Sequence, residues 1–169
     1  MPIVLITNPK GGCGKSTAAT NLAGYFAWRG HPTMLGDLDR QQSALAWLGI
    51  RPATLPHIRS WDRSDEKIAR PPKGVTHVVL DTPAGLRGHA LRDVMKLADR
   101  VIVPVQPSIF DIYATQAFLT KLADRDLLDG APRVGILGMR VDARTRAADQ
   151  LQRFVEDAAD PGLVELGRG

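Results

Sequence analysis

The feature that most constrains this chain is a glycine-rich segment near its N-terminus, Lys10-Gly11-Gly12-Cys13-Gly14-Lys15-Ser16-Thr17. It follows the apolar run Ile3-Val4-Leu5-Ile6, which predicts a buried strand, and it precedes a segment that predicts a helix. Glycines let backbone N–H groups converge on phosphate oxygens, and a helix N-terminus adds partial positive charge. In such a loop Lys15 reaches the β- and γ-phosphates and the Ser16 hydroxyl ligates Mg²⁺. The sequence therefore predicts a nucleotide-binding loop, although Pro9 stands where the generic pattern has its first glycine.

Short apolar runs alternate along the chain with longer amphipathic segments. The predicted strands cover residues 3–7, 33–36, 77–80, 101–105 and 134–139, and the predicted helices cover residues 16–28, 42–48, 62–69, 88–97, 111–125 and 143–158. Polar, proline-containing residues 49–73 are interpreted as a surface excursion with one short helix. The alternation predicts an α/β fold, a three-layer sandwich in which a mostly parallel, twisted sheet is flanked by helices. We expect the 169 residues to form a single domain, residues 1–169.

Composition narrows the classes of protein. The formal net charge of +4 permits nucleic-acid binding but does not demand it, because the arginines are scattered along the chain. No apolar run approaches the ~20 residues that span a bilayer, and the N-terminus lacks the pattern of a signal peptide. The single cysteine, Cys13, excludes an intrachain disulfide framework. We therefore expect a cytoplasmic protein.

Carboxylates follow two of the predicted strands. Asp81 ends the run His77-Val78-Val79-Leu80, where it would hold Mg²⁺ directly or through water; the alternative is a cap on the next helix. Asp37 and Asp39 follow the second strand, and one of them could orient the water that attacks a γ-phosphate. An isolated pair of this kind is more often a turn or a cap. Because ligands of parallel sheets bind at the carboxyl ends of strands, these carboxylates are expected near the glycine-rich loop.

Together these motifs closely resemble the ParA/MinD family of P-loop ATPases, which carry a deviant Walker A motif. The family pattern is Lys-Gly-Gly-x-Gly-Lys-Ser/Thr, then Asp-x-Asp after the second strand, then an apolar strand that ends in Asp-Thr/Ser-Pro. The segment Val103-Pro104-Val105-Gln106-Pro107-Ser108, followed by Asp111, is similar to the ParA (partition protein) subgroup, as is Asp39-x-Gln41. The resemblance covers about residues 2–158, with Arg40 standing where the family usually has proline.

The resemblance implies a homodimer that forms on ATP binding, with two ATP molecules and Mg²⁺ between the subunits. Lys10 would be the signature lysine that reaches the phosphates of the partner's ATP, while Lys15 serves the phosphates in cis. Asp39 matches the hydrolytic aspartate, and Asp37 matches a carboxylate linked to the switch region. The remaining contacts would come from Gly11, Gly12, Cys13, Gly14, Ser16 and Thr17 to the nucleotide, and from Ser16, Asp39 and Asp81 to the surroundings of Mg²⁺.

Members of the ParA subgroup bind DNA without sequence preference, and a ParB-like or other adaptor protein stimulates hydrolysis. The resemblance therefore implies a bacterial, nucleoid-associated ATPase that positions plasmids, chromosomes or other cargo. Exposed arginines near the C-terminal helix could supply phosphate contacts, or they could form an ordinary solvated face. These arginines are Arg140, Arg144, Arg146 and Arg153.

Other functions remain open from the sequence. A nucleotide-dependent scaffold with little hydrolysis would share the loop, and so would a dethiobiotin-synthetase-like ligase. Membrane attachment is disfavoured because residues 163–169 lack a basic apolar stripe, and the single cysteine disfavours an iron–sulfur cluster. The four histidines are dispersed along the sequence and do not suggest a metal site. Residues 160–169 are short for the family's C-terminal part, so weak nucleotide affinity or reduced ATPase activity is a further hypothesis.

Overall fold

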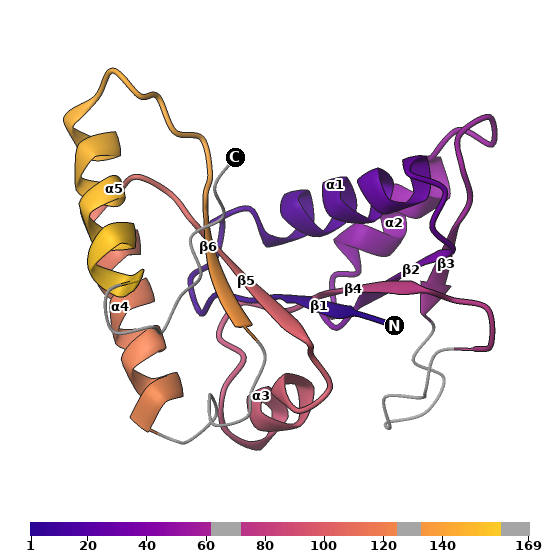
Figure 1. Ribbon diagram of the computed structural model, residues 1–169, viewed down its shortest axis with the longest axis horizontal. Helices are drawn as coiled ribbons and strands as arrows, with labels where there is room; N and C mark the ends of the chain where they lie inside the picture. Colours follow the sequence, from indigo (N-terminus) through magenta and orange to yellow (C-terminus); the bar gives the residue numbers. More distant parts are fainter. Residues whose placement is uncertain (62–71, 125–132, 160–169) are drawn as a thin grey trace.

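A computed structural model describes residues 1–61, 72–124 and 133–159, which form one parallel sheet flanked by helices (Figure 1). Its strands run in the order β3-β2-β4-β1-β5-β6. The strands are β1 (Ile3–Ile6), β2 (Thr33–Asp37), β3 (Ile58–Trp61), β4 (His77–Asp81), β5 (Arg100–Val105) and β6 (Arg133–Gly138). The helices are α1 (Lys15–Trp28), α2 (Ser43–Ile50), α3 (Gly88–Met95), α4 (Ile109–Asp124) and α5 (Arg146–Ala159). The predicted α/β fold is confirmed.

Each face of the sheet packs its own hydrophobic core. On one face α1 and α2 bury Ala19 and Ala44 against Leu35 of β2. On the other face α3, α4 and α5 pack over residues such as Leu80 and Val103 (Figure 1). Because both faces are covered, the strands are continuously apolar rather than alternating. The sheet and its two helical layers make the predicted three-layer sandwich.

The interpretation of residues 49–73 was wrong in one respect, because they contain a strand. β3 pairs in parallel with β2 at the edge of the sheet, in a register that joins Gly36 to Trp61. Only Ile58 and Trp61 of this strand are buried, so its sequence lacks an apolar run and tertiary pairing decides its structure. A Cβ at Gly36 would lie 2.6 Å from Cδ2 of Leu80 and 3.3 Å from the Trp61 side chain, so the glycine makes room for both side chains. The predicted helix at 62–69 lies outside the described residues.

The last described helix, α5, begins three residues later than its amphipathic pattern predicts. The Thr145 hydroxyl accepts a hydrogen bond from the Ala148 N–H at 3.2 Å, which caps the helix after a turn from Asp142. Leu151 and Phe154 face the core, and Arg146 and Arg153 are exposed. Within the described ranges no helix has both the length and the apolar character needed to cross a membrane.

Candidate nucleotide-binding site

The glycine-rich loop joins β1 to α1 at the carboxyl end of the sheet. Gly12 and Gly14 have φ angles of 75° and 101°, in the left-handed region that favours glycine. A Cβ at Gly14 would also lie 2.7 Å from the Cε atom of Met139. Gly11 and Gly12 are exposed, whereas Cys13 is buried. The loop therefore presents backbone to solvent and turns its one thiol inward, as a phosphate cradle requires.

The two lysines of the loop meet through one carbonyl group. The Lys15 ammonium is buried and donates a hydrogen bond to the backbone oxygen of Lys10 at 2.9 Å. The Cys13 thiol donates to the same oxygen at 3.3 Å. Burial raises the pKa of the Cys13 thiol, and the nearby Lys15 charge opposes that change only in part. Cys13 is thus a neutral packing residue that shapes the loop.

Asp81 is the least satisfied polar group of the site. Its side chain is fully buried at the end of β4, and no hydrogen bond of good geometry reaches either carboxylate oxygen from the described residues. Burial raises the pKa of Asp81 to about 6. The Ser16 side chain lowers this pKa, the negative charge of Asp37 raises it further, and the positive charge of Lys15 lowers it. An orphaned carboxylate beside a serine hydroxyl is an oxygen donor set that fits Mg²⁺.

Asp37 and Asp39 have different surroundings although one residue separates them. Asp37 is buried, and its two oxygens accept hydrogen bonds from the N–H groups of Asp39 at 2.9 Å and Ala44 at 2.8 Å. It therefore closes the turn after β2 and caps α2, the alternative that the pattern had left open. Asp39 is partly exposed, and among the described residues its carboxylate accepts only the Gln41 N–H, at 3.1 Å. Of the pair, Asp39 has oxygen atoms free to act on a ligand.

The other predicted nucleotide contacts lie at the start of α1. Ser16 is partly buried beside Asp81, whereas Thr17 is exposed on the first turn of the helix. The Thr17 carbonyl accepts hydrogen bonds from the side chains of Asn21 at 2.8 Å and Thr20 at 3.1 Å, and its hydroxyl forms no hydrogen bond within the described residues. Lys15, Ser16 and Asp81 therefore converge, while Thr17 lies on their solvent side.

Three residues that the sequence did not single out for the site brace the loop. Gln106, after β5, donates its side-chain N–H to the Gly12 carbonyl at 2.7 Å. Met139, after β6, packs against Gly14. Asn8 accepts the Lys10 N–H at 2.9 Å. Gln106 lies in the segment that resembles the ParA subgroup, but nothing local in the sequence predicts these three contacts.

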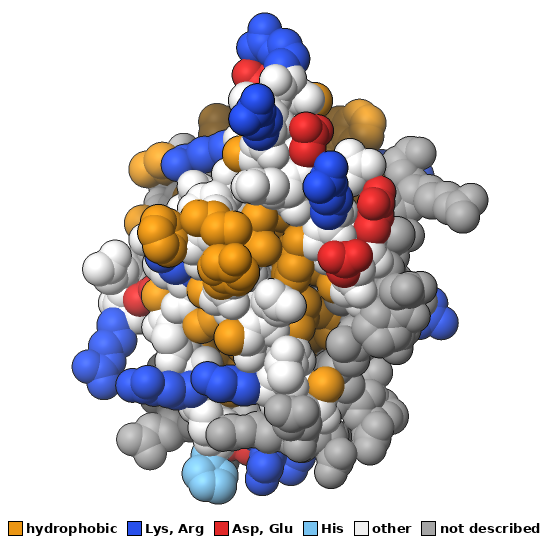
Figure 2. Space-filling model, turned by 90° about the vertical axis from the view of Figure 1, so that its left-hand side faces the viewer, with side chains coloured by type: hydrophobic (Ala, Val, Ile, Leu, Met, Phe, Trp, Pro, Cys, Tyr) orange, Lys and Arg blue, Asp and Glu red, His pale blue; other side chains and the backbone are white. Residues whose placement is uncertain are grey.

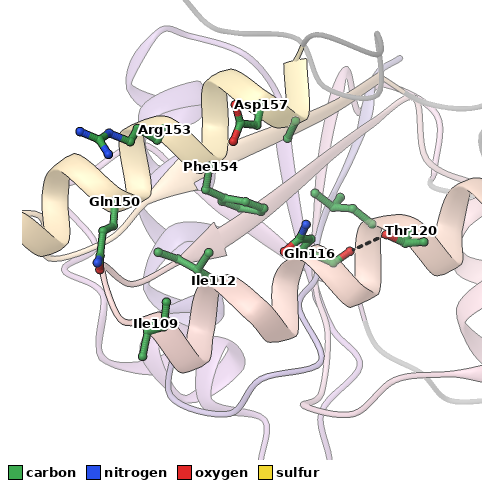
Figure 3. Close-up of a pocket in the computed structure, with 10 residues that line it drawn as sticks. Ile109, Ile112, Gln116, Thr120, Gln150, Arg153, Phe154 and Asp157 are labelled. Carbon is green, nitrogen blue, oxygen red and sulfur yellow. Dashed lines mark hydrogen bonds between the residues drawn. The ribbon is translucent and has the colours of Figure 1, made fainter.

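The arginines proposed as DNA contacts lie after β6 and in α5, the last described elements of the chain. Arg144 is paired with Asp142, with an Nη2–Oδ2 distance of 2.8 Å, and this pairing lowers the pKa of Asp142. Arg140 and Arg146 are exposed and have no recorded ion pair within the described ranges. Arg153 lies on the rim of a groove of about 410 Å³ between α4 and α5 (Figure 3). Two of the four residues thus lie between β6 and α5, and the other two lie in α5.

Comparison with known proteins identifies the family. Residues 4–163 match the model of the CobQ/CobB/MinD/ParA nucleotide binding domain. The chain belongs to this family. It is 32% identical over 164 residues to the "Maintenance of carboxysome distribution protein A" of Gloeobacter kilaueensis, covering 95% of this chain and 74% of that protein.

Solved structures of the family share its fold. A plasmid partition protein of Borrelia burgdorferi bound to AMPPNP superposes with a TM-score of 0.71 at 18% identity, covering 92% of this chain and 80% of that one. pNOB8 ParA bound to nonspecific DNA superposes with a TM-score of 0.72 at 15% identity, covering 92% and 74%. These structures confirm the fold.

Proposed function

We propose that this ParA/MinD-type protein is an ATPase that dimerises around two ATP molecules, binds DNA without sequence preference and positions a cargo. The observation that supports the proposal is the environment of Lys10. Its backbone is fixed beside the buried Lys15, yet its own partly buried side chain has no recorded carboxylate partner within the described residues. The phosphate cradle already contains one cation, Lys15. A second cation just before the cradle is therefore suited to bind a triphosphate held by another subunit.

The nucleotide chemistry follows from the groups at the loop. Lys15 and the exposed backbone of Gly11 and Gly12 bind the phosphates of the subunit's own ATP. Ser16 and Asp81 would hold Mg²⁺, which would neutralise phosphate charge when bound. Asp39 orients the attacking water, because it is the carboxylate of its pair that keeps free oxygens.

An exposed apolar surface next to the loop supports dimerisation. Ile109, Phe110 and Tyr113 on the first turns of α4 are 41%, 73% and 61% exposed. Figure 2 shows hydrophobic side chains gathered in the middle of this side of the molecule. The same helix reaches the loop, since Thr115 bonds to Asn8 at 3.0 Å. A contiguous apolar patch of this kind marks an interaction surface, and its position would let a second subunit cover the site.

The proposals on DNA binding, the adaptor and the cargo rest on charge and on similarity to other proteins. The net charge of +4, the exposed Arg140, Arg146 and Arg153, and the DNA-bound ParA with the same fold support contacts to phosphates. The relative named for carboxysome distribution supports a positioning role. We propose that a ParB-like or other adaptor stimulates hydrolysis and that the protein associates with the bacterial nucleoid.

The decisive experiment measures molecular mass by light scattering with and without a non-hydrolysable ATP analogue and Mg²⁺. We expect the analogue to convert monomer to dimer, and Lys10→Ala to remain monomeric while still binding the analogue. A dimer that survives Lys10→Ala would remove the trans role of this lysine. DNA binding by the dimer should then fall steeply between low and moderate salt.

Turnover separates the remaining alternatives. ATPase activity that rises with DNA and an adaptor fits the positioning function. An ATP-dependent dimer without turnover would instead identify a scaffold, and turnover that requires a small metabolite would identify a ligase.

A further inference from the structure

The side-chain amide of Asn8 links the glycine-rich loop to the rest of the molecule. It lies directly after β1 and is 1% exposed. Its Oδ1 atom accepts the Lys10 N–H at 2.9 Å. Its Nδ2 atom donates to the Pro104 carbonyl at 2.8 Å and to the Thr115 hydroxyl at 3.0 Å. One amide therefore joins the loop, the end of β5 and the interior of α4.

The chemistry of the partners fixes the orientation of this amide. A backbone N–H can only donate, so the Asn8 oxygen must face Lys10. A backbone carbonyl can only accept, so the Asn8 nitrogen must face Pro104. Thr115, itself fully buried, completes the second donor of the amide. Such a satisfied buried network holds one arrangement, because any rotation of the amide leaves buried polar groups unpaired.

The network connects two features that the proposed function uses. At one end is the backbone of Lys10, whose N–H is held by Asn8 and whose carbonyl holds Lys15. At the other end is α4, two residues beyond the exposed Tyr113. A shift of α4 along or about its axis would move the Thr115 hydroxyl and loosen the Asn8 amide.

We propose that Asn8 is a positioning residue for Lys10, and that its bond to Thr115 makes the loop respond to whatever contacts α4. This inference rests on the proposed trans role of Lys10. Binding of the nucleotide within one subunit depends mainly on Lys15 and the glycines, so loosening the Asn8 link affects dimerisation more than nucleotide affinity. Contact at the α4 surface, conversely, tightens the placement of Lys10.

Two matched substitutions at Thr115 test the link. Thr115→Val removes the hydroxyl at nearly constant volume, and Thr115→Ser keeps it. With a non-hydrolysable ATP analogue and Mg²⁺, we expect Thr115→Val to weaken the dimer about tenfold, as loss of one buried hydrogen bond implies. Its monomer should bind the analogue within about twofold of the original chain, since one bond outside the cradle is lost. Thr115→Ser should retain the original dimer affinity.

Asn8→Ser and a control at the other end of the sheet complete the design. The Asn8→Ser hydroxyl can still accept the Lys10 N–H two residues on but is too short to reach α4. Combined with Thr115→Val, it should weaken the dimer no more than Asn8→Ser alone, because Asn8→Ser already removes the bond to Thr115. Thr33→Val removes another buried hydroxyl, which bonds to the His31 carbonyl at 2.8 Å, and it should lower thermal stability without changing the dimer.

The outcomes separate the two proposals. If Lys10→Ala breaks the dimer but Thr115→Val and Asn8→Ser do not, the positioning role is wrong and the proposed function stands. If Lys10→Ala leaves the dimer intact, both are wrong. Should Thr115→Val fail to fold, hydrogen exchange of Asn8→Ser decides: faster exchange in residues 9–14 but not in β2 supports the link, and equal exchange in both overturns it.

Discussion

The two ends of the same parallel sheet are built differently. At the carboxyl end, the buried Asp81 has no good hydrogen-bond donor among the residues that the structure describes, and the buried Lys15 is held by a backbone carbonyl. At the amino end, Asp99 accepts the Ile3 N–H at 2.7 Å and the Thr33 hydroxyl donates to the His31 carbonyl at 2.8 Å. Among the described residues, the carboxyl end thus holds a buried carboxylate without a good donor, whereas these polar groups at the amino end are paired.

The difference shows which end of the sheet lowers the stability of the ligand-free protein. A buried carboxylate without a good donor raises the free energy of the folded state, and protonation or a bound cation relieves it. The left-handed glycines of the loop lie at the same end. Substitutions at the carboxyl end should therefore change ligand binding strongly and some should stabilise the free protein, whereas those at the amino end should change stability alone.

The largest expected effect is on nucleotide binding by Lys15→Ala. Removing the buried ammonium takes away the main cationic partner of the phosphates in cis, a loss of about 100-fold or more in affinity. Calorimetric titration with an ATP analogue and Mg²⁺ measures it. Lys96→Ala, an exposed lysine after α3, is the matched control and should bind normally. Equal affinities for the two variants would contradict the assignment of the loop.

The next largest effect is expected for Asp39→Ala. Its rate of ATP hydrolysis should fall about 100-fold while the ATP dimer is retained, because the carboxylate acts on water and not on the phosphates. Phosphate release and light scattering give the two quantities. Asp37→Asn provides the contrast within the same turn. It replaces one of the two oxygens that accept backbone N–H groups by an NH₂ group, which can only donate, so it should lower the unfolding temperature, whereas Asp39→Ala should not. Unimpaired hydrolysis by Asp39→Ala would assign the water to another group.

Much of this site could be predicted from the sequence, because local chemistry determines it. The loop, the carboxylate after β4 and the alternation of strands and helices depend on residue type and spacing, and the fold confirms the architecture they predict. β3 was missed because two of its residues are exposed and only pairing with β2 makes Ile58–Trp61 a strand. Asn8, Gln106 and Met139 could not be predicted as braces, since their partners come from distant parts of the chain. The same holds for His31 and His77, which are far apart in sequence but stack with ring centroids 4.1 Å apart.

A smaller effect should appear in the stability of the free protein when Asp81 is neutralised. Raising the pKa of Asp81 from 3.8 to about 6 means that the folded state holds the proton more tightly than the unfolded chain. Stability from this group is therefore greatest at low pH, and up to about 3 kcal/mol is lost as pH rises through this window. Asp81→Asn should accordingly stabilise the metal-free protein at pH 7.5 and have little effect at pH 4.

Urea unfolding at the two pH values, without metal or nucleotide, measures the effect of Asp81→Asn. The same variant should no longer be stabilised by the ATP analogue with Mg²⁺, whereas the original chain should be. A variant that is destabilised at pH 7.5 would show that Asp81 is paired in the folded state, and the contrast between the two ends of the sheet would disappear.

The smallest effect is expected at the amino end and has the opposite sign. The pKa of His77 is lowered from 6.5, first by burial, then by the adjacent His31 and the N-terminal amine. Its ring lies 4.6 Å from that of Phe26, an environment that favours neutral imidazole. The folded state thus binds this proton less tightly than the unfolded chain, so stability is complete above pH 6.5 and declines as pH falls below it. His77→Gln should flatten that decline without altering nucleotide affinity. If urea unfolding between pH 7.5 and 5 showed the same slope for both proteins, the histidine pair would carry no charge-dependent stability, and the amino end would be satisfied by its backbone contacts alone.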